Sequence, residues 1–508
     1  MPGQTADQSG SQFDHVSIIV FGASGDLAKK MTYPAIYSLV KNGRLQKDKL
    51  HVVGTARSEY KIEDFRKKIQ PGISKKDKSE SESKDFLEIC SYVQLKGYDD
   101  AESYKKLNDE LNKLERGSGK HLRLFYIALP PSAFEDVAAN VRTAAWAEGK
   151  TNRIIIEKPY GKDYKSAKTL SSHLEKLYKE EELYRIDHYL GKDAVKCVLP
   201  LRFGANPILA NSWSREHIKY VTINFKEEFG AEGRGGYFDE FGMIRDVMQN
   251  HLMQWIILSG MEKPKSLSTN DIHIAKLNFI KACRPIRPED TLVGQYGASS
   301  KDKDKKAYVD DDTVKDDSKA NTFATAVLFV DTERWKDVPF VIRAGKALDE
   351  TRAEITFVFK SDKDALFPTK APTSFTIREH PHRSHTLTLY TKQSGSGFRV
   401  VSAPLAVDMV DTELGTADKY QPSAYESLIY DAVQGDQTWF IPREEAEEGW
   451  KIWDDAIKGT ENRTPFKYEY GSEGPKEEKE FLEKWGVRFG TQETSVADVT
   501  KLFSAAKI

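Results

Sequence analysis

Strand-like and helix-like stretches alternate through roughly the first 185 residues, and this alternation constrains the fold more than any other feature. A β-branched run at residues 16–21 ends at Gly22, and helix-forming sequence follows from residue 26 to about residue 40. Similar strand-like runs recur at residues 50–54, 122–129 and 153–156. Because parallel strands need long crossover connections, which are usually helices, the alternation predicts an α/β domain with a doubly wound parallel sheet.

The pattern changes after residue 201, where strand-like runs follow one another without regular intervening helices. These runs lie at residues 221–225, 323–330, 338–342, 355–359 and 375–390. They predict an antiparallel α+β domain. Because 508 residues are too many for one typical core, we expect more than one domain. We place a disordered N-terminal tail at 1–15, the doubly wound domain at 16–200 and the second domain at 201–508.

The composition is that of a globular protein, with 39% hydrophobic and 30% charged residues. The formal net charge of -2 gives no electrostatic argument for nucleic acid or a membrane surface as the main partner. The longest apolar runs are far too short to span a bilayer, and the polar N-terminus lacks the apolar core of a signal peptide. Three widely spaced cysteines form neither a metal motif nor a disulfide framework: Cys90, Cys197 and Cys283. We therefore expect a cytoplasmic enzyme without a bound metal.

The turn after the first strand has the composition of a nucleotide-binding loop. It consists of Gly22, Ala23, Ser24, Gly25, Asp26 and Leu27. A strand that leads through a glycine turn into a helix can present backbone N–H groups to a pyrophosphate. The match to the G-x-G-x-x-G pattern is imperfect, because the glycines are three residues apart and Ala28 stands where the third glycine is expected. The alternative interpretation is a tight turn without a ligand.

The end of the second strand favours NADP over NAD. An NAD enzyme usually places an acid there for the ribose hydroxyls, whereas this chain has Arg57 and Ser58, and no acid before Glu59. The Arg57 guanidinium can make two hydrogen bonds to a 2′-phosphate, although an ordinary surface arginine is the alternative. Later strands end in proline-marked turns near Tyr126 and Lys158. Ligands of open α/β sheets bind at such strand ends, so both residues are candidates for cofactor contacts.

Residues 185–192, with the sequence RIDHYLGK, hold two cations, a carboxylate, an imidazole and a phenol. A buried element cannot hold so many polar groups unless each has a partner. His188, Tyr189 and Lys192 can converge on a phosphate, which leaves Asp187 to orient another catalytic group. The alternative is an exposed, solvated loop with ion pairs.

Residues 242–255 have the pattern of a helix with a histidine on its apolar face. Residues at every fourth position share this face: Met243, Val247, His251 and Trp255. A histidine in such a place is more often a hydrogen-bonded core residue than a base. Asp246 lies five residues before His251, about 140° away on a regular helix. A partner that orients His251 must therefore come from another segment, and Asp187 is a candidate.

Several segments are similar, in the same order, to segments of the glucose-6-phosphate dehydrogenase family. They are GASGDLAKK, ALPPS, EKPYG, RIDHYLGK, FKEEFGAEGRGGYFDEFGMIRDVMQNHLMQ, VGQYG and IRAGKAL. The resemblance implies an oxidoreductase that converts D-glucose 6-phosphate to 6-phospho-D-glucono-1,5-lactone with NADP, the first step of the oxidative pentose phosphate pathway. It implies a Rossmann-like NADP-binding domain and a β+α substrate-binding domain with a large, mostly antiparallel sheet. It also implies a homodimer or homotetramer.

The resemblance assigns roles to the matching residues. His251 resembles the general base that takes the proton of the C1 hydroxyl, and Asp187 resembles the carboxylate that orients this base. Imidazole suits the task because its unperturbed pKa is near neutrality. The residues that match the 6-phosphate pocket are His188, Tyr189 and Lys192. The residues that match contacts to the sugar hydroxyls are Lys158, Glu227, Asp246 and Lys346.

The chain departs from the family in one region. Members with a second, non-catalytic NADP usually have two basic residues after the GKAL segment, whereas this chain has Thr351 and Arg352. A second structural NADP is therefore left open, and residues 361–418 carry no family signature that we can align. Two alternatives also stay open, namely another NADP-dependent sugar oxidoreductase and a non-catalytic NADP-binding sensor. The segments RIDHYLGK and QNHL argue against the first, and retention of the whole polar set argues against the second.

Overall fold

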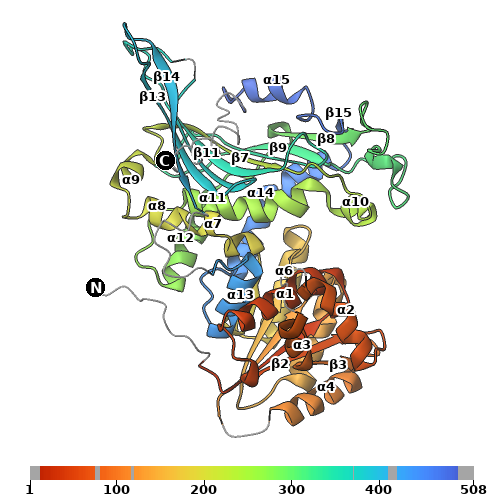
Figure 1. Ribbon diagram of the computed structural model, residues 1–508. Helices are drawn as coiled ribbons and strands as arrows, with labels where there is room; N and C mark the ends of the chain where they lie inside the picture. The colour runs from red at the N-terminus through yellow and green to blue at the C-terminus, as the bar shows by residue number, and fades with distance from the viewer. Residues whose placement is uncertain (1–11, 75–79, 116–118, 370, 410–419, 490–508) are drawn as a thin grey trace. The chain divides into compact units, whose positions relative to one another are not determined.

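The computed structural model describes residues 12–74, 80–115, 119–369, 371–409 and 420–489, and Figure 1 shows the path of the chain. The chain divides into two compact units. The first unit takes in residues 1–192, 265–273 and 420–447, and the second takes in residues 193–264, 274–419 and 448–508. Among the described residues, every helix is too short or too polar to cross a membrane.

A six-stranded parallel sheet forms the centre of the first unit, in the order β3-β2-β1-β4-β5-β6. Its strands are β1 (His15–Phe21), β2 (Leu50–Ala56), β3 (Cys90–Gln94), β4 (His121–Ile127), β5 (Thr151–Ile156) and β6 (Leu183–Arg185). The strand order reverses between β1 and β4, and dinucleotides bind at the carboxyl ends of strands at such a switch point. The predicted doubly wound parallel sheet is confirmed.

Helices pack against both faces of this sheet. One face carries α1 (Tyr33–Lys41), α2 (Ile62–Ser74), α3 (Glu80–Glu88) and α13 (Ala424–Gln434), and the other carries α4 (Ala101–Leu114), α5 (Phe134–Asn140) and α6 (Tyr164–Leu177). Ile18 and Val20 of β1 belong to the first core, whereas Ile19 and Phe21 belong to the second. Because both faces of β1 are buried, its sequence is a continuous apolar run.

Two domain boundaries differ from those expected from the sequence. Phe13 is only 5% exposed and β1 begins at His15, so the expected disordered tail does not extend to residue 15. Residues 1–11 lie outside the described part of the chain. Leu428 and Val433 of α13 pack into the same core as β1, which places residues 420–447 in the first unit. The first compact unit therefore also takes in residues beyond the expected boundary at residue 200.

A nine-stranded sheet forms the centre of the second unit, in the order β14-β13-β12-β11-β7-β10-β9-β8-β15. Its strands are β7 (Ile218–Lys226), β8 (Thr291–Gly297), β9 (Phe323–Leu328), β10 (Phe340–Gly345), β11 (Arg352–Phe359), β12 (Ser374–His380), β13 (Ser384–Lys392), β14 (Val400–Asp408) and β15 (Phe466–Glu469). β7 and β10 are parallel, as are β8 and β15, and all other neighbouring pairs are antiparallel. The large, mostly antiparallel sheet is confirmed.

The remaining helices are distributed along the rest of the chain. They are α7 (Asp193–Lys196), α8 (Val198–Arg202), α9 (Pro207–Ser212), α10 (Gly235–Met243), α11 (Met253–Gly260), α12 (Thr269–Ala282), α14 (Arg443–Thr460) and α15 (Glu478–Glu483). Figure 1 shows α10 and α11 on one face of the nine-stranded sheet and α15 on the other. A π-helix, Ile244–Leu252, joins α10 to α11 and packs against β10.

Candidate active site

The turn after β1 is built around Gly22. This residue has a φ of 74°, and a Cβ atom on it would lie 2.3 Å from the carbonyl oxygen of Ala128. Only glycine therefore fits there without strain. The Gly25 N–H donates to the Gly22 carbonyl at 2.8 Å, which closes the turn. Ala28 begins a π-helical turn and is fully buried, so its small side chain is accommodated where the pattern has a third glycine.

Two charged side chains lie exposed at the same edge of the parallel sheet. Asp26 forms ion pairs with Lys30 at 2.9 Å and Lys29 at 3.0 Å, and these hydrogen bonds lower the pKa of Asp26 to about 2. Arg57 directly follows β2, and its guanidinium lies 5.3 Å from the ring centroid of Tyr98. Since β1 and β2 are parallel neighbours, their carboxyl ends bring the glycine turn and Arg57 to one edge.

The end of β5 buries a carboxyl group that the sequence analysis did not single out. Glu157 is 4% exposed, and its Oε1 accepts a hydrogen bond from the Tyr126 hydroxyl at 2.5 Å. Burial raises the pKa of Glu157 to about 7, although this hydrogen bond and the charge of Lys158 act in the opposite direction. The sequence feature that could have indicated Glu157 is its position directly before the candidate Lys158. Lys158 itself is half-buried. The cofactor contacts expected of Tyr126 and Lys158 stay predictions.

Residues 185–192 lead from the end of β6 into a short 3₁₀ turn, His188–Gly191. Asp187 is 1% exposed, and its Oδ1 accepts the backbone N–H of Tyr189 at 2.9 Å. The Tyr189 ring is buried, and the Lys192 ammonium lies 4.4 Å from its centroid. The interpretation of this segment as an exposed, solvated loop is therefore wrong. All three predicted phosphate ligands lie in the first unit, and the rings of His188 and Tyr189 have centroids 5.3 Å apart.

The third predicted phosphate ligand contacts a residue that the sequence analysis missed. His188 stacks on Tyr425 of α13, with ring centroids 5.7 Å apart and planes at 13°. A Cβ atom on Gly191 would lie 2.4 Å from the carbonyl oxygen of Ala424, so the glycine allows α13 to approach the loop. Burial raises the pKa of Tyr425 well above its ordinary value, and the negative charges of Glu157 and Asp187 add to the effect.

In the second unit, the parallel pairing of β7 with β10 brings two candidate sugar ligands together. Lys226 at the end of β7 is in register with Gly345 at the end of β10. The next residues along each strand, Glu227 and Lys346, form an ion pair through Oε2 and Nζ. Lys346 is 8% exposed and lies 5.2 Å from the ring centroid of Phe229. Two groups with hydrogen-bonding capacity for hydroxyls thus lie side by side.

The helical segment that carries His251 is not the regular helix that the sequence predicts. α10 has a kink at Gly242, whose φ is 62°, and the π-helix follows it. Hydrogen bonds of a π-helix span five residues instead of four. Residues five positions apart, such as Asp246 and His251, therefore lie closer to the same side of a π-helix than of an α-helix. The angular argument against Asp246 as a neighbour of His251 fails for this reason.

His251 is buried, as its place among apolar residues predicts. It is 4% exposed, and its backbone N–H donates to Asn250 Oδ1 at 2.7 Å. The other members of the predicted apolar face are also buried: Met243, Val247 and Trp255. Burial of the imidazole strengthens its electrostatic interaction with any charged partner.

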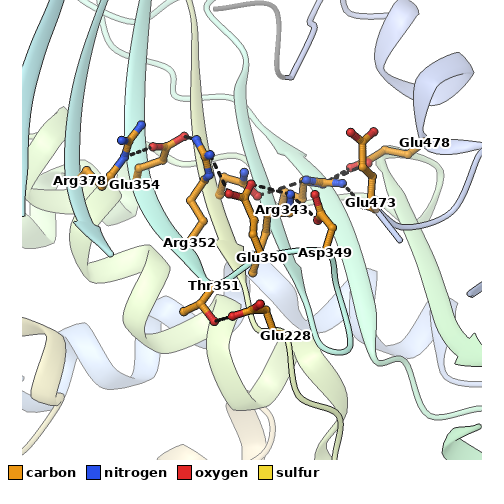
Figure 2. A network of polar contacts seen from close by, with 12 residues as sticks. Glu228, Arg343, Asp349, Glu350, Thr351, Arg352, Glu354, Arg378, Glu473 and Glu478 are labelled. Atoms are coloured by element: carbon orange, nitrogen blue, oxygen red, sulfur yellow. Dashed lines mark hydrogen bonds and ion pairs between the residues drawn. The ribbon is translucent and has the colours of Figure 1, made fainter. Parts of the chain in front are cut away.

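Arg343 of β10 lies three residues before Lys346 and pairs with a different partner. It lies within β10, is 5% exposed, and its Nε donates to Glu478 Oε1 of α15 at 3.0 Å. Figure 2 shows this pair as one end of a network of charged side chains on the sheet. Only Lys346 thus lies at the end of β10 beside Glu227.

Comparison with known proteins agrees with this architecture. Residues 19–197 match the family model "Glucose-6-phosphate dehydrogenase, NAD binding domain", and residues 199–490 match "Glucose-6-phosphate dehydrogenase, C-terminal domain". A glucose-6-phosphate 1-dehydrogenase of Saccharomyces cerevisiae is 43% identical over 479 residues, which are 92% of this chain and 93% of that protein. The Emericella nidulans enzyme of the same name is 40% identical over 486 residues, which are 94% of this chain and 93% of that protein.

A solved structure titled "Glucose-6-phosphate dehydrogenase in complex with its substrate glucose-6-phosphate" has a TM-score of 0.88 and 39% identity to this chain. The match covers 95% of this chain and 100% of that one. Both domains are therefore matched, each along nearly its whole length. This chain belongs to the glucose-6-phosphate dehydrogenase family.

Proposed function

We propose that this chain oxidises D-glucose 6-phosphate at C1 to 6-phospho-D-glucono-1,5-lactone, with NADP as the hydride acceptor. The observation that carries the proposal is the match of both family models, which together cover nearly all of residues 19–490. The complete set of polar residues expected for the reaction lies within these matches. Glucose-6-phosphate 1-dehydrogenase activity is the first step of the oxidative pentose phosphate pathway.

In this mechanism His251 is the general base. Its neutral imidazole takes the proton of the C1 hydroxyl while the hydride leaves C1, so the C–O bond becomes the lactone carbonyl. NADP, when bound, supplies the nicotinamide ring that accepts the hydride. The Asp187 carboxylate orients the imidazole and stabilises the imidazolium that forms.

The remaining site residues bind and orient the sugar phosphate. His188, Tyr189 and Lys192 hold the 6-phosphate, with Lys192 supplying a full positive charge. The sugar hydroxyls are held by Lys158, Glu227, Asp246 and Lys346. The ion pair of Glu227 with Lys346 supports this assignment, because it fixes a donor and an acceptor at one place.

The reduction of NADP to NADPH can be measured directly, and this measurement separates the candidate functions. Purified protein with NADP and glucose 6-phosphate should form NADPH, and unphosphorylated glucose should be a poor substrate. Another sugar oxidoreductase would prefer a different sugar, and a non-catalytic sensor would bind NADP without reducing it. Either of those results would replace the proposed reaction.

We expect Arg57→Ala to weaken NADP binding and leave NAD binding nearly unchanged. The guanidinium makes a charge-assisted hydrogen bond to the 2′-phosphate, worth about 1.5–3 kcal/mol, or roughly 10- to 150-fold in affinity. Equilibrium titration with both cofactors measures the difference. Arg284→Ala is a matched control, because Arg284 is also exposed and lies 5.8 Å from the centroid of an aromatic ring, Phe329. Equal losses for NADP and NAD would make Arg57 a structural residue.

We also propose that each chain binds a single NADP. Arg352 follows the GKAL segment, where relatives with a second NADP usually have two basic residues. Its guanidinium is 8% exposed and donates to Glu350 at 2.8 Å and Glu354 at 3.2 Å (Figure 2). Glu354 also accepts a hydrogen bond from Arg378 at 2.7 Å. Since these charges are balanced within the chain, a second dinucleotide phosphate would have to displace existing ion pairs.

We also propose a homodimer or homotetramer and a cytoplasmic location. Leu405 and Val407 of β14 lie on the same face of a hairpin as Leu389 of β13, and all three are exposed in the protomer. Exposed apolar side chains that gather on one face are typical of surfaces that bind another chain. A relative from Arabidopsis thaliana, 40% identical over 490 residues, carries "cytoplasmic" in its name.

A further inference from the structure

Tyr468 is a buried residue to which the proposed reaction assigns no role. It lies in β15, which pairs in parallel with β8, and it is 5% exposed. Its hydroxyl donates to the backbone carbonyl of Lys346 at 2.8 Å. Lys346 is one of the proposed sugar ligands, and it directly follows β10. A phenol from a different strand of the second unit thus contacts the backbone of a proposed substrate ligand.

A second buried hydroxyl fixes the orientation of the Tyr468 phenol. Thr322 is fully buried, and its Oγ1 lies 2.9 Å from the Tyr468 hydroxyl oxygen. This Oγ1 also accepts the backbone N–H of Tyr296 at 3.0 Å, while the Thr322 carbonyl accepts the backbone N–H of Lys346 at 2.9 Å. Burial raises the pKa of Tyr468 well above its ordinary value, so the phenol keeps the proton that it donates. Tyr468 and Thr322 therefore hold the carbonyl and the N–H of Lys346, respectively.

The residue after Lys346 shows how firmly this turn is held. Ala347 has a φ of 53°, in the left-handed region that residues with a side chain rarely adopt. Its N–H donates to the Phe229 carbonyl at 2.9 Å, and its carbonyl accepts the Gly471 N–H at 2.8 Å. Such a conformation persists only where the surrounding contacts enforce it. Hydrogen bonds from other segments of the second unit thus fix the backbone at Lys346 and beyond it.

The far end of the Lys346 side chain is fixed as well. Its ammonium forms an ion pair with Glu227, whose own N–H donates to the Gly345 carbonyl at 3.0 Å. The Glu227 carbonyl in turn accepts the Leu348 N–H at 2.9 Å. Because lysine carries its charge on a flexible four-carbon stem, the ammonium stays in one place only if both ends of this stem are held.

We propose that Tyr468 is a positioning residue for sugar binding: its hydroxyl fixes the backbone of Lys346 and thereby the ammonium that contacts the sugar hydroxyls. The inference rests on the proposed function, because only that function makes Lys346 a ligand of the substrate. Tyr468 itself contacts neither substrate nor cofactor in this account. Loss of its hydroxyl should therefore weaken substrate binding more than it slows the chemical step.

Tyr468→Phe tests the inference, because it removes the hydroxyl and keeps the ring. We expect KM for glucose 6-phosphate to rise about 3- to 10-fold, the range for loss of one hydrogen bond, while kcat stays within about twofold of the native value. Tyr308→Phe is the matched control, since it removes another buried hydroxyl of the second unit, which donates to Asp239 Oδ1 at 3.2 Å. That control should lower the melting temperature and leave KM unchanged.

Combination with Lys346→Met separates positioning from a general loss of stability. If Tyr468 acts through the Lys346 ammonium, adding Tyr468→Phe to Lys346→Met should not raise KM further. A native KM in folded Tyr468→Phe would overturn the inference. A double variant whose KM rises by the product of the two single effects would also overturn it.

Thr322→Val provides the same test if Tyr468→Phe does not fold. It removes the hydroxyl that orients the phenol and keeps the carbonyl that accepts the Lys346 N–H. KM should rise in this variant as well, and a native KM would then overturn the inference. Native protein that forms no NADPH from glucose 6-phosphate would instead contradict the proposed function, and a native KM in Lys346→Met would contradict the role assigned to Lys346.

Discussion

Replacement of His251 by asparagine is expected to slow the chemical step by roughly 10²–10⁴-fold, the range for loss of a positioned general base. Asparagine keeps a comparable shape and hydrogen-bonding capacity but has no basic nitrogen. Glucose 6-phosphate should therefore still bind with nearly unchanged affinity in an equilibrium titration. Single-turnover measurement of NADPH formation gives the rate of the chemical step itself.

The rival explanation treats His251 as a core residue, because it is 4% exposed and the other residues of its helix face are apolar and buried. That explanation predicts a lower melting temperature for His251→Asn and a normal kcat per folded molecule. Val247→Ala is a suitable control, since Val247 lies in the same π-helix and is equally buried. The control should lose stability and keep its turnover. A normal kcat in folded His251→Asn would refute the catalytic assignment.

Replacement of Lys192 by methionine is expected to raise KM for glucose 6-phosphate by roughly 10- to 150-fold. The change keeps the length of the side chain and removes the charge that we propose binds the phosphate dianion. A charge-assisted contact of this kind is worth about 1.5–3 kcal/mol. Unphosphorylated glucose has no phosphate, so its kcat/KM should change little. Steady-state kinetics with both sugars separate the two effects.

Lys196→Met is the matched control for this experiment. Lys196 lies four residues further along the chain, in α7, and has no assigned part in phosphate binding. Its substitution should leave KM for both sugars near the native value. Equal losses for glucose 6-phosphate and glucose in Lys192→Met would place Lys192 away from the phosphate.

Much of the first unit could be predicted from the sequence because its signals are local. The β-branched run before Gly22 and the later apolar runs indicated four of the six strands, and the helical stretches between them indicated a parallel sheet. The position of α13 could not be predicted in the same way. No local sequence signal assigns this helix to either unit, and only the folded chain shows that Leu428 and Val433 belong to the core around β1.

The geometry around His251 could not be predicted from periodicity. The same pattern of apolar residues is compatible with a π-helix and with an α-helix. The two helices differ in whether their backbone hydrogen bonds span five residues or four. The resemblance to a family identified His251, but the assumed regular helix gave a wrong angle to Asp246. Glycine at position 242, with its φ of 62°, marks where the regular pattern ends.

The pairing of Glu157 with Tyr126 was missed for a different reason. The two residues are 31 positions apart, and they meet only because β4 and β5 are adjacent, parallel and in a particular register. Tyr425 lies still further along the chain from His188, on which it stacks. Such contacts depend on tertiary packing, which motif spacing does not encode.

We propose that Asp187 and His251 act as one catalytic pair. Comparison of kcat for Asp187→Asn, His251→Asn and the double variant tests it most directly, with folding of each checked by its melting temperature. If the two residues act as a unit, the double variant should be about as slow as His251→Asn alone, because the orienting carboxylate has nothing left to orient. A double variant slowed by the product of the two single effects would show that they act independently, and would contradict the proposed mechanism.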